Sequence, residues 1–202
     1  NAAGNGPFSA EISNTTLQPE TSRSYDVGVV FSNNIPNGDV RAAVTLFRRD
    51  SSNLIDYVSP TGYFNVGRTR AQGFEVEAAA GLTEQLSVRG AYTFLDATNR
   101  ANGKQLVRRP RHALSASLDW VTPFHDLTLG ADLRLVGDSF DDRENFTAID
   151  GHALVTLRAS LPIGEHFELY GRIENVADAQ YETVAGYGTY GRSAYAGVRL
   201  KW

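Results

Sequence analysis

The stretch from residue 167 to residue 202 reads as strand, loop and strand, and the alternation of apolar and polar side chains in its two strands constrains the fold more than any other feature of the sequence. A period of two is typical of a β-strand with one apolar and one wet face. In the final segment five apolar residues share one phase: Ala194, Ala196, Val198, Leu200 and Trp202. The other phase carries polar, charged and small residues. Small and aliphatic groups on one face and charges on the other are typical of a membrane barrel wall between lipid and an aqueous lumen.

The same alternation recurs along most of the chain. Besides residues 167–175 and 193–202, seven segments show it: 24–31, 39–48, 73–82, 86–95, 113–120, 127–135 and 152–161. Four short connections with turn-forming residues lie at 33–38, 82–85, 121–126 and 161–166. Four long connections lie between them, at 50–70, 96–112, 136–151 and 176–191. Short turns at one end and long loops at the other predict an all-β, antiparallel, up-and-down transmembrane β-barrel wall of about nine strands.

The composition excludes several classes of function. The net charge of −4 gives no basic surface, so we expect no nucleic-acid partner. Cysteine is absent, so thiol chemistry and disulfides are excluded. No apolar run of about 18 residues predicts a transmembrane helix. The mean hydropathy of −0.29 is compatible with a barrel, because the strands of a barrel are only half apolar.

Nine strands are an odd number, whereas bacterial barrels usually have an even number. A nine-stranded sheet in lipid would also leave two unpaired edges, where backbone groups lack hydrogen-bond partners. We therefore expect these strands to be the last part of a larger sheet. No signal peptide is visible at Asn1, so the sequence is expected to be a processed chain or a fragment.

Four regions resemble TonB-dependent outer-membrane receptors in their order and spacing. They are residues 17–28 (LQPETSRSYDVG), 65–77 (NVGRTRAQGFEVE), 91–97 with 109–112 (AYTFLDA and RPRH), and 174–192 (ENVADAQYETVAGYGTYGR). The last of these is most similar to the vitamin B12 receptors within that family. Two departures are Val176 and Ala177 in place of the commoner Leu-Phe pair, and Trp202 in place of the usual Phe.

The resemblance implies that residues 1–202 are the C-terminal part of a 22-stranded barrel closed around an N-terminal plug domain. The plug and the TonB box are expected to lie outside this chain. The implied function is TonB-dependent active import of a scarce, large ligand, either cobalamin or a ferric siderophore. Expected partners are outer-membrane lipid and lipopolysaccharide, TonB acting through the plug, and the remainder of the barrel. No cofactor is implied.

Two loops supply candidate ligand-binding residues. Asp138 and Asp141 lie with Asp142 and Glu144 in an acidic loop, which could offer oxygen ligands to a hard cation but is more simply a solvated loop. Three tyrosines in the last long loop could stack on a bulky ligand or belong to an interfacial aromatic belt: Tyr181, Tyr187 and Tyr190. No metal site is predicted.

Further residues are given structural roles. Val198, Leu200 and Trp202 are expected to form a C-terminal assembly signal, as the resemblance implies. Trp120, Phe124, Phe167 and Trp202 are expected near the short turns, in a periplasmic aromatic girdle. Mixed charges in the wet phase predict cross-strand pairs that stiffen the lumen wall or contact the plug.

Other classes of protein remain as alternatives. One is a passive porin or adhesin-like barrel, and another is a soluble β-sandwich. An enzyme is disfavoured, because the histidines are scattered and residues 137–140 lack the Gly-x-Ser-x-Gly turn. No catalytic residue is therefore predicted.

Overall fold

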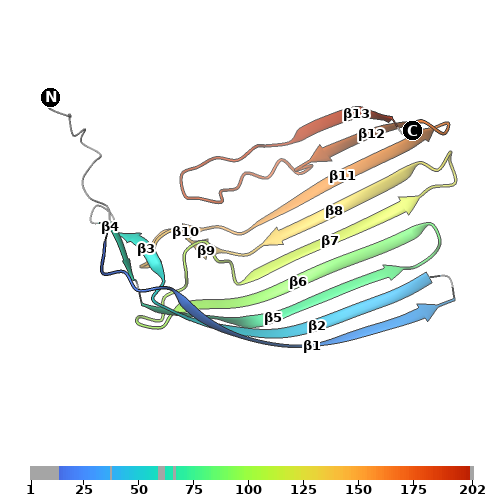
Figure 1. The fold of residues 1–202 in the computed structure, drawn as a ribbon. Helices are drawn as coiled ribbons and strands as arrows, with labels where there is room; N and C mark the ends of the chain where they lie inside the picture. Colours follow the sequence, from blue (N-terminus) through green and yellow to red (C-terminus); the bar gives the residue numbers. More distant parts are fainter. Residues whose placement is uncertain (1–13, 37, 59–61, 66, 201–202) are drawn as a thin grey trace, which may run out of the picture.

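The computed structural model describes residues 14–36, 38–58, 62–65 and 67–200, and most of them belong to one nine-stranded antiparallel sheet (Figure 1). The strands follow one another in chain order: β1 (Thr21–Ile35), β2 (Gly38–Ser52), β5 (Arg68–Gly81), β6 (Leu86–Asn99), β7 (His112–Val121), β8 (Thr128–Val136), β11 (His152–Ile163), β12 (Phe167–Glu174) and β13 (Ser193–Leu200). Each strand pairs with its neighbour in sequence. The predicted all-β, up-and-down wall of nine strands is confirmed.

The two ends of the sheet differ as predicted. Short turns join the strands at one end, and long loops join them at the other (Figure 1). Two of the long loops contain hairpins that the sequence analysis missed: β3 (Ile55–Val58) with β4 (Gly62–Asn65), and β9 (Ser139–Phe140) with β10 (Ala148–Ile149). β1 and β2 are also longer than predicted, at 15 residues each. The hydrogen-bonded pairing of these two strands continues into positions where polar residues occupy both faces. Alternation of hydropathy therefore does not identify these positions as strand.

The register places the two predicted phases on opposite faces. Leu157 pairs with Ala131 on one side and Ile173 on the other, whereas its neighbour Thr156 pairs with Asp132. Directly paired residues point to the same face of a sheet. Apolar residues of four strands therefore share one face: Leu129, Leu133, Val155, Leu157, Ile173, Val198 and Leu200. Trp202 lies outside the described residues.

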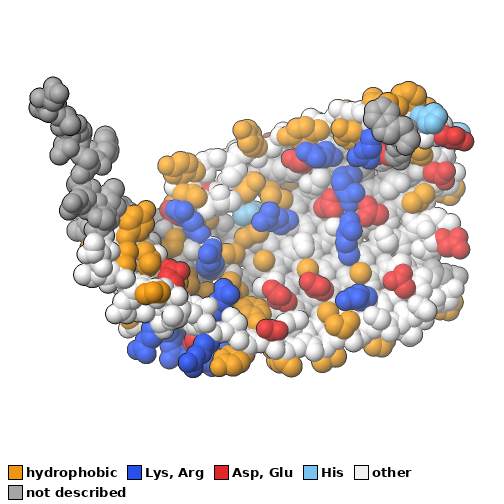
Figure 2. All heavy atoms as spheres, viewed as in Figure 1, with side chains coloured by type: hydrophobic (Ala, Val, Ile, Leu, Met, Phe, Trp, Pro, Cys, Tyr) orange, Lys and Arg blue, Asp and Glu red, His pale blue; other side chains and the backbone are white. Residues whose placement is uncertain are grey.

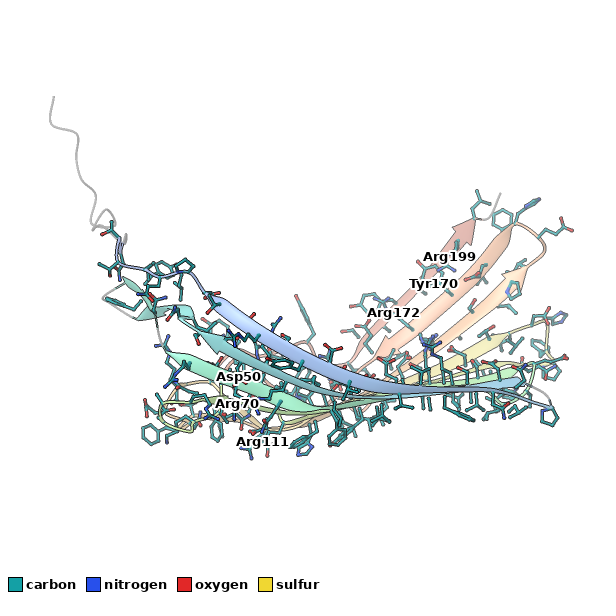
Figure 3. All side chains as sticks on the ribbon, turned by 60° about the horizontal axis from the view of Figure 1, so that its bottom comes forward. Asp50, Arg70, Arg111, Tyr170, Arg172 and Arg199 are labelled. Carbon is teal, nitrogen blue, oxygen red and sulfur yellow. The ribbon has the colours of Figure 1, made fainter. Side chains whose placement is uncertain are left out.

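The sheet is a single curved layer (Figure 3). The charged phase lines the concave face, which Figure 2 shows with acidic and basic side chains spread over the middle strands. The apolar phase lies on the convex face and is largely exposed, with Val29 at 74% and Val198 at 63%. An exposed apolar face of this extent is stable only against another apolar medium.

A soluble sandwich would pack a second sheet against this apolar face. In the described part of the chain no such sheet is present, since the two remaining sheets are the short hairpins in the loops. The β-sandwich alternative is therefore wrong. None of the described residues forms a helix long and apolar enough to span a membrane. The outermost strands β1 and β13 each pair with one neighbour only, so the described sheet is an unclosed section of wall.

Aromatic residues mark the short-turn end. Trp120 lies near the turn between β7 and β8, Phe124 lies within that turn, and Phe167 is the first residue of β12. All three side chains are exposed. Their position agrees with the girdle predicted from the sequence.

Candidate functional site

The loop between β6 and β7 docks against the loop between β8 and β11 through paired amide contacts. The backbone N–H of Gln105 donates to the Asn145 side-chain oxygen at 2.8 Å, and the Asn145 side chain donates back to the Gln105 carbonyl at 3.1 Å. The backbone N–H of Arg108 donates to the Phe140 carbonyl at 2.8 Å. Asn145 adopts a positive φ of 58°, a conformation that asparagine tolerates better than most residues. The two loops therefore form one structural unit above the wall.

An ion pair strengthens this contact between the loops. The Arg108 Nε donates to Asp141 Oδ1 at 2.5 Å. This hydrogen bond, together with the attraction of the carboxylate, raises the pKa of Arg108. Asp141, one of the predicted ligand contacts, is thus already engaged within the protein. Lys104 adds a further link, because its ammonium donates to the Glu144 carbonyl at 3.0 Å.

Two further aspartates of this loop, Asp142 and Asp138, hold its backbone. The Asp142 carboxylate accepts the backbone N–H groups of Glu144, Phe146 and Thr147. The Thr147 N–H makes the largest contribution to lowering the pKa of Asp142. The resulting stabilisation is present above the ordinary carboxyl pKa and is lost as the pH falls through the lowered value. Asp138 accepts the N–H of Gly151 at 2.7 Å.

These contacts leave the acidic loop without the arrangement of a cation site. Among the residues that the structure describes, no group of three or more His, Cys, Asp or Glu side chains is placed to hold a metal. Sequence reasoning grouped the acidic residues by proximity along the chain. It did not detect Arg108 or the backbone amides as their partners, because these contacts depend on how the loops dock.

The last long loop is organised by residues at its two ends. Asn175 is buried and makes two hydrogen bonds with the backbone of Ala179, each at 2.9 Å. Asp178 accepts the N–H of Arg192 at 2.8 Å, which ties the start of the loop to its end. The Thr189 hydroxyl donates to the Tyr181 carbonyl at 2.7 Å. The loop between β12 and β13 therefore has an ordered frame built from local polar contacts.

The three tyrosines predicted as ligand contacts lie in different environments. Tyr181 packs on His152, with the ring centroids 4.3 Å apart. Tyr187 and Tyr190 point into solvent and are 72% and 90% exposed. Two of the three are thus free to meet a ligand, and Tyr181 supports the base of the loop.

A hollow of about 400 Å³ lies under this loop on the concave face. Its wall contains inward residues of β7, β8 and β11, and its rim contains residues from the last loop and β13. The lining includes Ser117, Asp132, Arg134, Thr156, Tyr190 and Tyr195. A second hollow of about 440 Å³ lies between residues 148–151 and 178–191. Phenol, hydroxyl, carboxylate and guanidinium groups together can stack on and hydrogen-bond to a large polar ligand.

Ion pairs cross the concave wall below the hollow. Arg158 contacts Asp132 at 2.6 Å and Asp119 at 3.0 Å, which links β11 to β8 and β7. Arg89 approaches Asp119 at 3.4 Å. Gly130 lies directly opposite Arg158, and a Cβ there would lie 2.7 Å from the guanidinium carbon. The missing side chain at Gly130 is what lets Arg158 reach across β8.

Two arginine–tyrosine stacks join the last two strands. Arg172 stacks over Tyr195 at 4.6 Å and Arg199 over Tyr170 at 5.4 Å. Arg199 also contacts Glu168 at 2.5 Å. Figure 3 shows Tyr170, Arg172 and Arg199 together on these strands. The predicted cross-strand charge pairs of the wall are therefore present.

Comparison with known proteins gives a family match over most of the chain. The family described as "TonB dependent receptor-like, beta-barrel" matches residues 1–176. Among solved structures, the chain is similar to the siderophore receptor PiuA from Acinetobacter baumannii, with 24% identity, a TM-score of 0.75, and coverage of 90% of this chain and 28% of that one.

Two further structures have the same fold. The ferripyoverdine receptor of the outer membrane of Pseudomonas aeruginosa, bound to ferripyoverdine, gives 19% identity and a TM-score of 0.72, covering 91% of this chain and 27% of that one. The copper transporter OprC gives 18% identity and a TM-score of 0.75, covering 93% and 32%. The chain spans less than a third of the length of each of these structures.

Proposed function

Because this chain belongs to the family of TonB-dependent receptor β-barrels, we propose that it forms the wall and outer loops through which a ferric siderophore is imported. The members of this family are outer-membrane barrel proteins and transporters, not enzymes. The outer-membrane location expected from the sequence is confirmed, and so is the expectation that the chain is not an enzyme. Membership in this family also disfavours a passive porin or adhesin-like barrel.

The observation that carries the proposal is the hollow beneath the last loop. It combines a polar concave wall with the exposed ring of Tyr190, and it lies at the long-loop end. Binding residues concentrate on loops held by a rigid scaffold. The paired contacts between the two middle loops supply such a scaffold, and the second hollow lies between one of these loops and the last loop.

The ligand class is argued from chemistry and from the similar proteins. A ferric siderophore is large and polar, which suits tyrosine rings above hydroxyl, carboxylate and guanidinium groups. PiuA and the ferripyoverdine receptor are named for siderophores, and OprC is named for copper. A ferric siderophore is therefore our first choice. Cobalamin, which the resemblance of residues 174–192 suggested, is the second.

The proposed partners follow from the unclosed sheet and the family. Backbone groups at the free edges of β1 and β13 need hydrogen-bond partners within a bilayer, so we propose that further barrel strands pair with them. Energy would come from TonB through a plug domain inside the barrel. Outer-membrane lipid and lipopolysaccharide would surround the convex face.

The proposal is tested with the full-length receptor by measuring binding of ferric siderophores and cobalamin. Tyr190→Ala should weaken binding of the true ligand about tenfold, as for an exposed aromatic contact at an interface. Tyr25→Ala is the matched control, because Tyr25 is an exposed tyrosine on the convex face, and it should leave affinity unchanged.

A larger change extends the same test. Shortening residues 176–191 to a tight turn should abolish uptake while the barrel still assembles. Uptake that survives this deletion would remove the last loop from the binding site. Tight binding of cobalamin without binding of any ferric siderophore would replace the first choice of ligand with the second.

A further inference from the structure

Four residues on the concave face of β12 and β13 form a continuous strip, which we call the arginine–tyrosine strip: Tyr195, Arg172, Tyr170 and Arg199. Arg172 pairs directly with Tyr195, and Tyr170 and Arg199 follow in the same phase on their strands. Each guanidinium stacks on a ring of the other strand. Figure 3 shows Arg172, Tyr170 and Arg199 one after another along these strands. Rings and cations therefore lie side by side along this part of the wall.

The strip begins at the hollow under the last loop and leads away from it toward the short turns. Tyr195 lines that hollow together with Tyr190 of the loop, whereas the other three residues of the strip lie beyond its lining. Arg199 follows Tyr195 by four residues on β13, which is about 13 Å along the strand. The strip therefore reaches deeper into the barrel than the outer hollow does.

Gly197 lets one ring of the strip lie against the wall. A Cβ at Gly197 would lie 2.5 Å from the Tyr170 hydroxyl oxygen and 2.6 Å from the ring carbon that carries it. Because Gly197 has no side chain, the Tyr170 ring lies across β13 instead of standing into the lumen. Tyr170 nevertheless remains exposed, so its ring offers a flat stacking surface.

The two arginines of the strip keep part of their hydrogen-bonding capacity. Arg172 contacts Glu174 at 2.9 Å through Nε, and this contact leaves the terminal nitrogens for other partners. Arg199 contacts Glu168 through one terminal nitrogen, and Glu168 itself is buried. The two arginine side chains are 50% and 59% exposed. The strip therefore presents guanidinium donors, and not the Glu168 carboxylate, to the lumen.

Arg172 lies at a position that stability alone does not favour. It pairs directly with Arg158 across β11 and β12, and like charges directly opposite each other destabilise a sheet. The two side chains diverge: Arg158 contacts Asp132 on β8, and Arg172 stacks over Tyr195 on β13. Local conflicts of this kind are expected at functional sites, where they are compensated elsewhere. The paired arginines therefore indicate a role for Arg172 beyond holding the wall together.

The neighbouring part of the wall offers a ligand much less. Arg158 holds Asp132 at 2.6 Å and Asp119 at 3.0 Å, so a ligand that moved inward along β7, β8 and β11 would compete with these ion pairs. Along β12 and β13 it would meet exposed rings and guanidinium groups that still have donors to offer.

We propose that the arginine–tyrosine strip is an inner subsite that receives an anionic, aromatic ferric complex after it leaves the outer hollow. Arg172 and Arg199 would donate to the oxygen atoms of the complex, and the rings of Tyr170 and Tyr195 would stack on its aromatic groups. A neutral complex without aromatic groups would use neither feature. The inference rests on the proposed function of the chain in importing a ferric siderophore.

The test compares binding with uptake for the full-length receptor. The probes are a ferric tris-catecholate, which is anionic and carries aromatic rings, and a ferric tris-hydroxamate, which is neutral and lacks them. Binding is measured in isolated outer membranes without an energy source, and uptake in energised cells. The test variant is Arg172→Gln with Arg199→Gln. The control is Arg41→Gln with Arg89→Gln, because these exposed arginines also face the concave side but lie on β2 and β6, outside the lining of the hollow.

The wild type should bind and import the ferric tris-catecholate. The test variant should bind it with a Kd within about twofold of the wild type but import it at least about tenfold more slowly, since charged hydrogen bonds are lost only on the inward path. The control should match the wild type in both measurements. Arg172→Lys with Arg199→Lys keeps the charges needed for assembly but loses the planar forks, so it should show the same normal binding with an intermediate loss of uptake.

The other outcomes separate this inference from the proposed function. Normal uptake by both substituted forms of the strip overturns the inner subsite and leaves the proposed function intact. Equal losses of binding and uptake would place the arginines in the outer site or in folding, and increased entry of large antibiotics would identify the plug as the occupant of the strip. Either result overturns the inner subsite. Import of the tris-hydroxamate alone by the wild type overturns the ligand class, and binding of neither probe by the wild type overturns the proposed function itself.

Discussion

The two faces of β8 and β11 are made by alternate residues of the same strands, yet they are organised in opposite ways. Leu133 and Leu157 on the convex face make no specific polar contact and are held only by their surroundings. On the concave face Arg158 joins Asp132 and Asp119 across three strands. The convex face takes its stability from contact with lipid, whereas the concave face, which meets water, relies on contacts between its own side chains.

The most severe test of this comparison introduces a lysine on each face in turn. Leu157→Lys places an ammonium near the middle of the lipid-facing band and should destabilise the barrel by about 2–4 kcal/mol. Thr156→Lys changes the adjacent residue on the concave face and should cost far less, because a lumen position is hydrated. The measurement is reversible unfolding of the full-length receptor in bilayers. Equal losses at both positions would contradict the assignment of the two faces.

The next effect concerns the centre of the concave network. Arg158→Met removes the cation shared by Asp119 and Asp132 while keeping much of the side-chain volume. We expect a loss of about 1–2 kcal/mol, since Asp132 loses its bridging arginine and Asp119 keeps only the exposed Arg89 at 3.4 Å. Unfolding of Arg158→Met, Asp132→Asn and the double variant gives the coupling energy of the pair. A coupling near zero would mean that the network is incidental to stability.

A smaller effect is expected at Gly130, which leaves room for the Arg158 side chain. Gly130→Ala would bring a methyl group within 2.7 Å of the guanidinium carbon, so Arg158 must shift and its bridge to Asp119 weakens. The expected loss is about 0.5–1 kcal/mol, as for one net hydrogen bond. Gly90→Ala is the control, because the nearest atom to its Cβ would lie at 3.5 Å. Thermal unfolding of both variants should show a lowered Tm for the first only.

The wall could be predicted from the sequence because its determinants are local. Alternation at Val155, Leu157 and their neighbours fixed both the strand and the face that each residue occupies, and the register agrees with it. The long loops could not be predicted in the same way. The pairing of Gln105 with Asn145 joins positions 40 residues apart and depends on how two loops meet. Short hairpins such as β9 with β10 contain too few residues for a period to be recognised.

The candidate site was predicted only in part, for a related reason. The sequence placed Tyr181, Tyr187 and Tyr190 in one loop, but their different exposures depend on contacts such as the packing of Tyr181 on His152. The acidic cluster was visible as well, but its partners Arg108 and the loop amides were not. Arg158 reaches Asp119 only because both residues pair with Gly130, which has no side chain between them. The alternation pattern of one strand does not show which residues of neighbouring strands are paired.

The smallest predicted effect separates the centre of the concave network from its edge. Arg89 meets Asp119 at 3.4 Å, but its side chain is 65% exposed and it contacts a carboxylate that Arg158 already neutralises. An exposed pair of this kind contributes little, because the charges are screened and the long side chain loses conformational freedom. Arg89→Gln should therefore change the free energy of unfolding by no more than about 0.5 kcal/mol, and added salt should remove even that difference.

The informative measurement is the same variant in an Arg158→Met background. There Arg89 is the nearest remaining cation to Asp119, so its removal should cost more than in the wild type. If Arg89→Gln proved as damaging as Arg158→Met in the wild type, the network would have no centre, and the concave face would be stabilised by its total charge balance instead of by one bridging arginine.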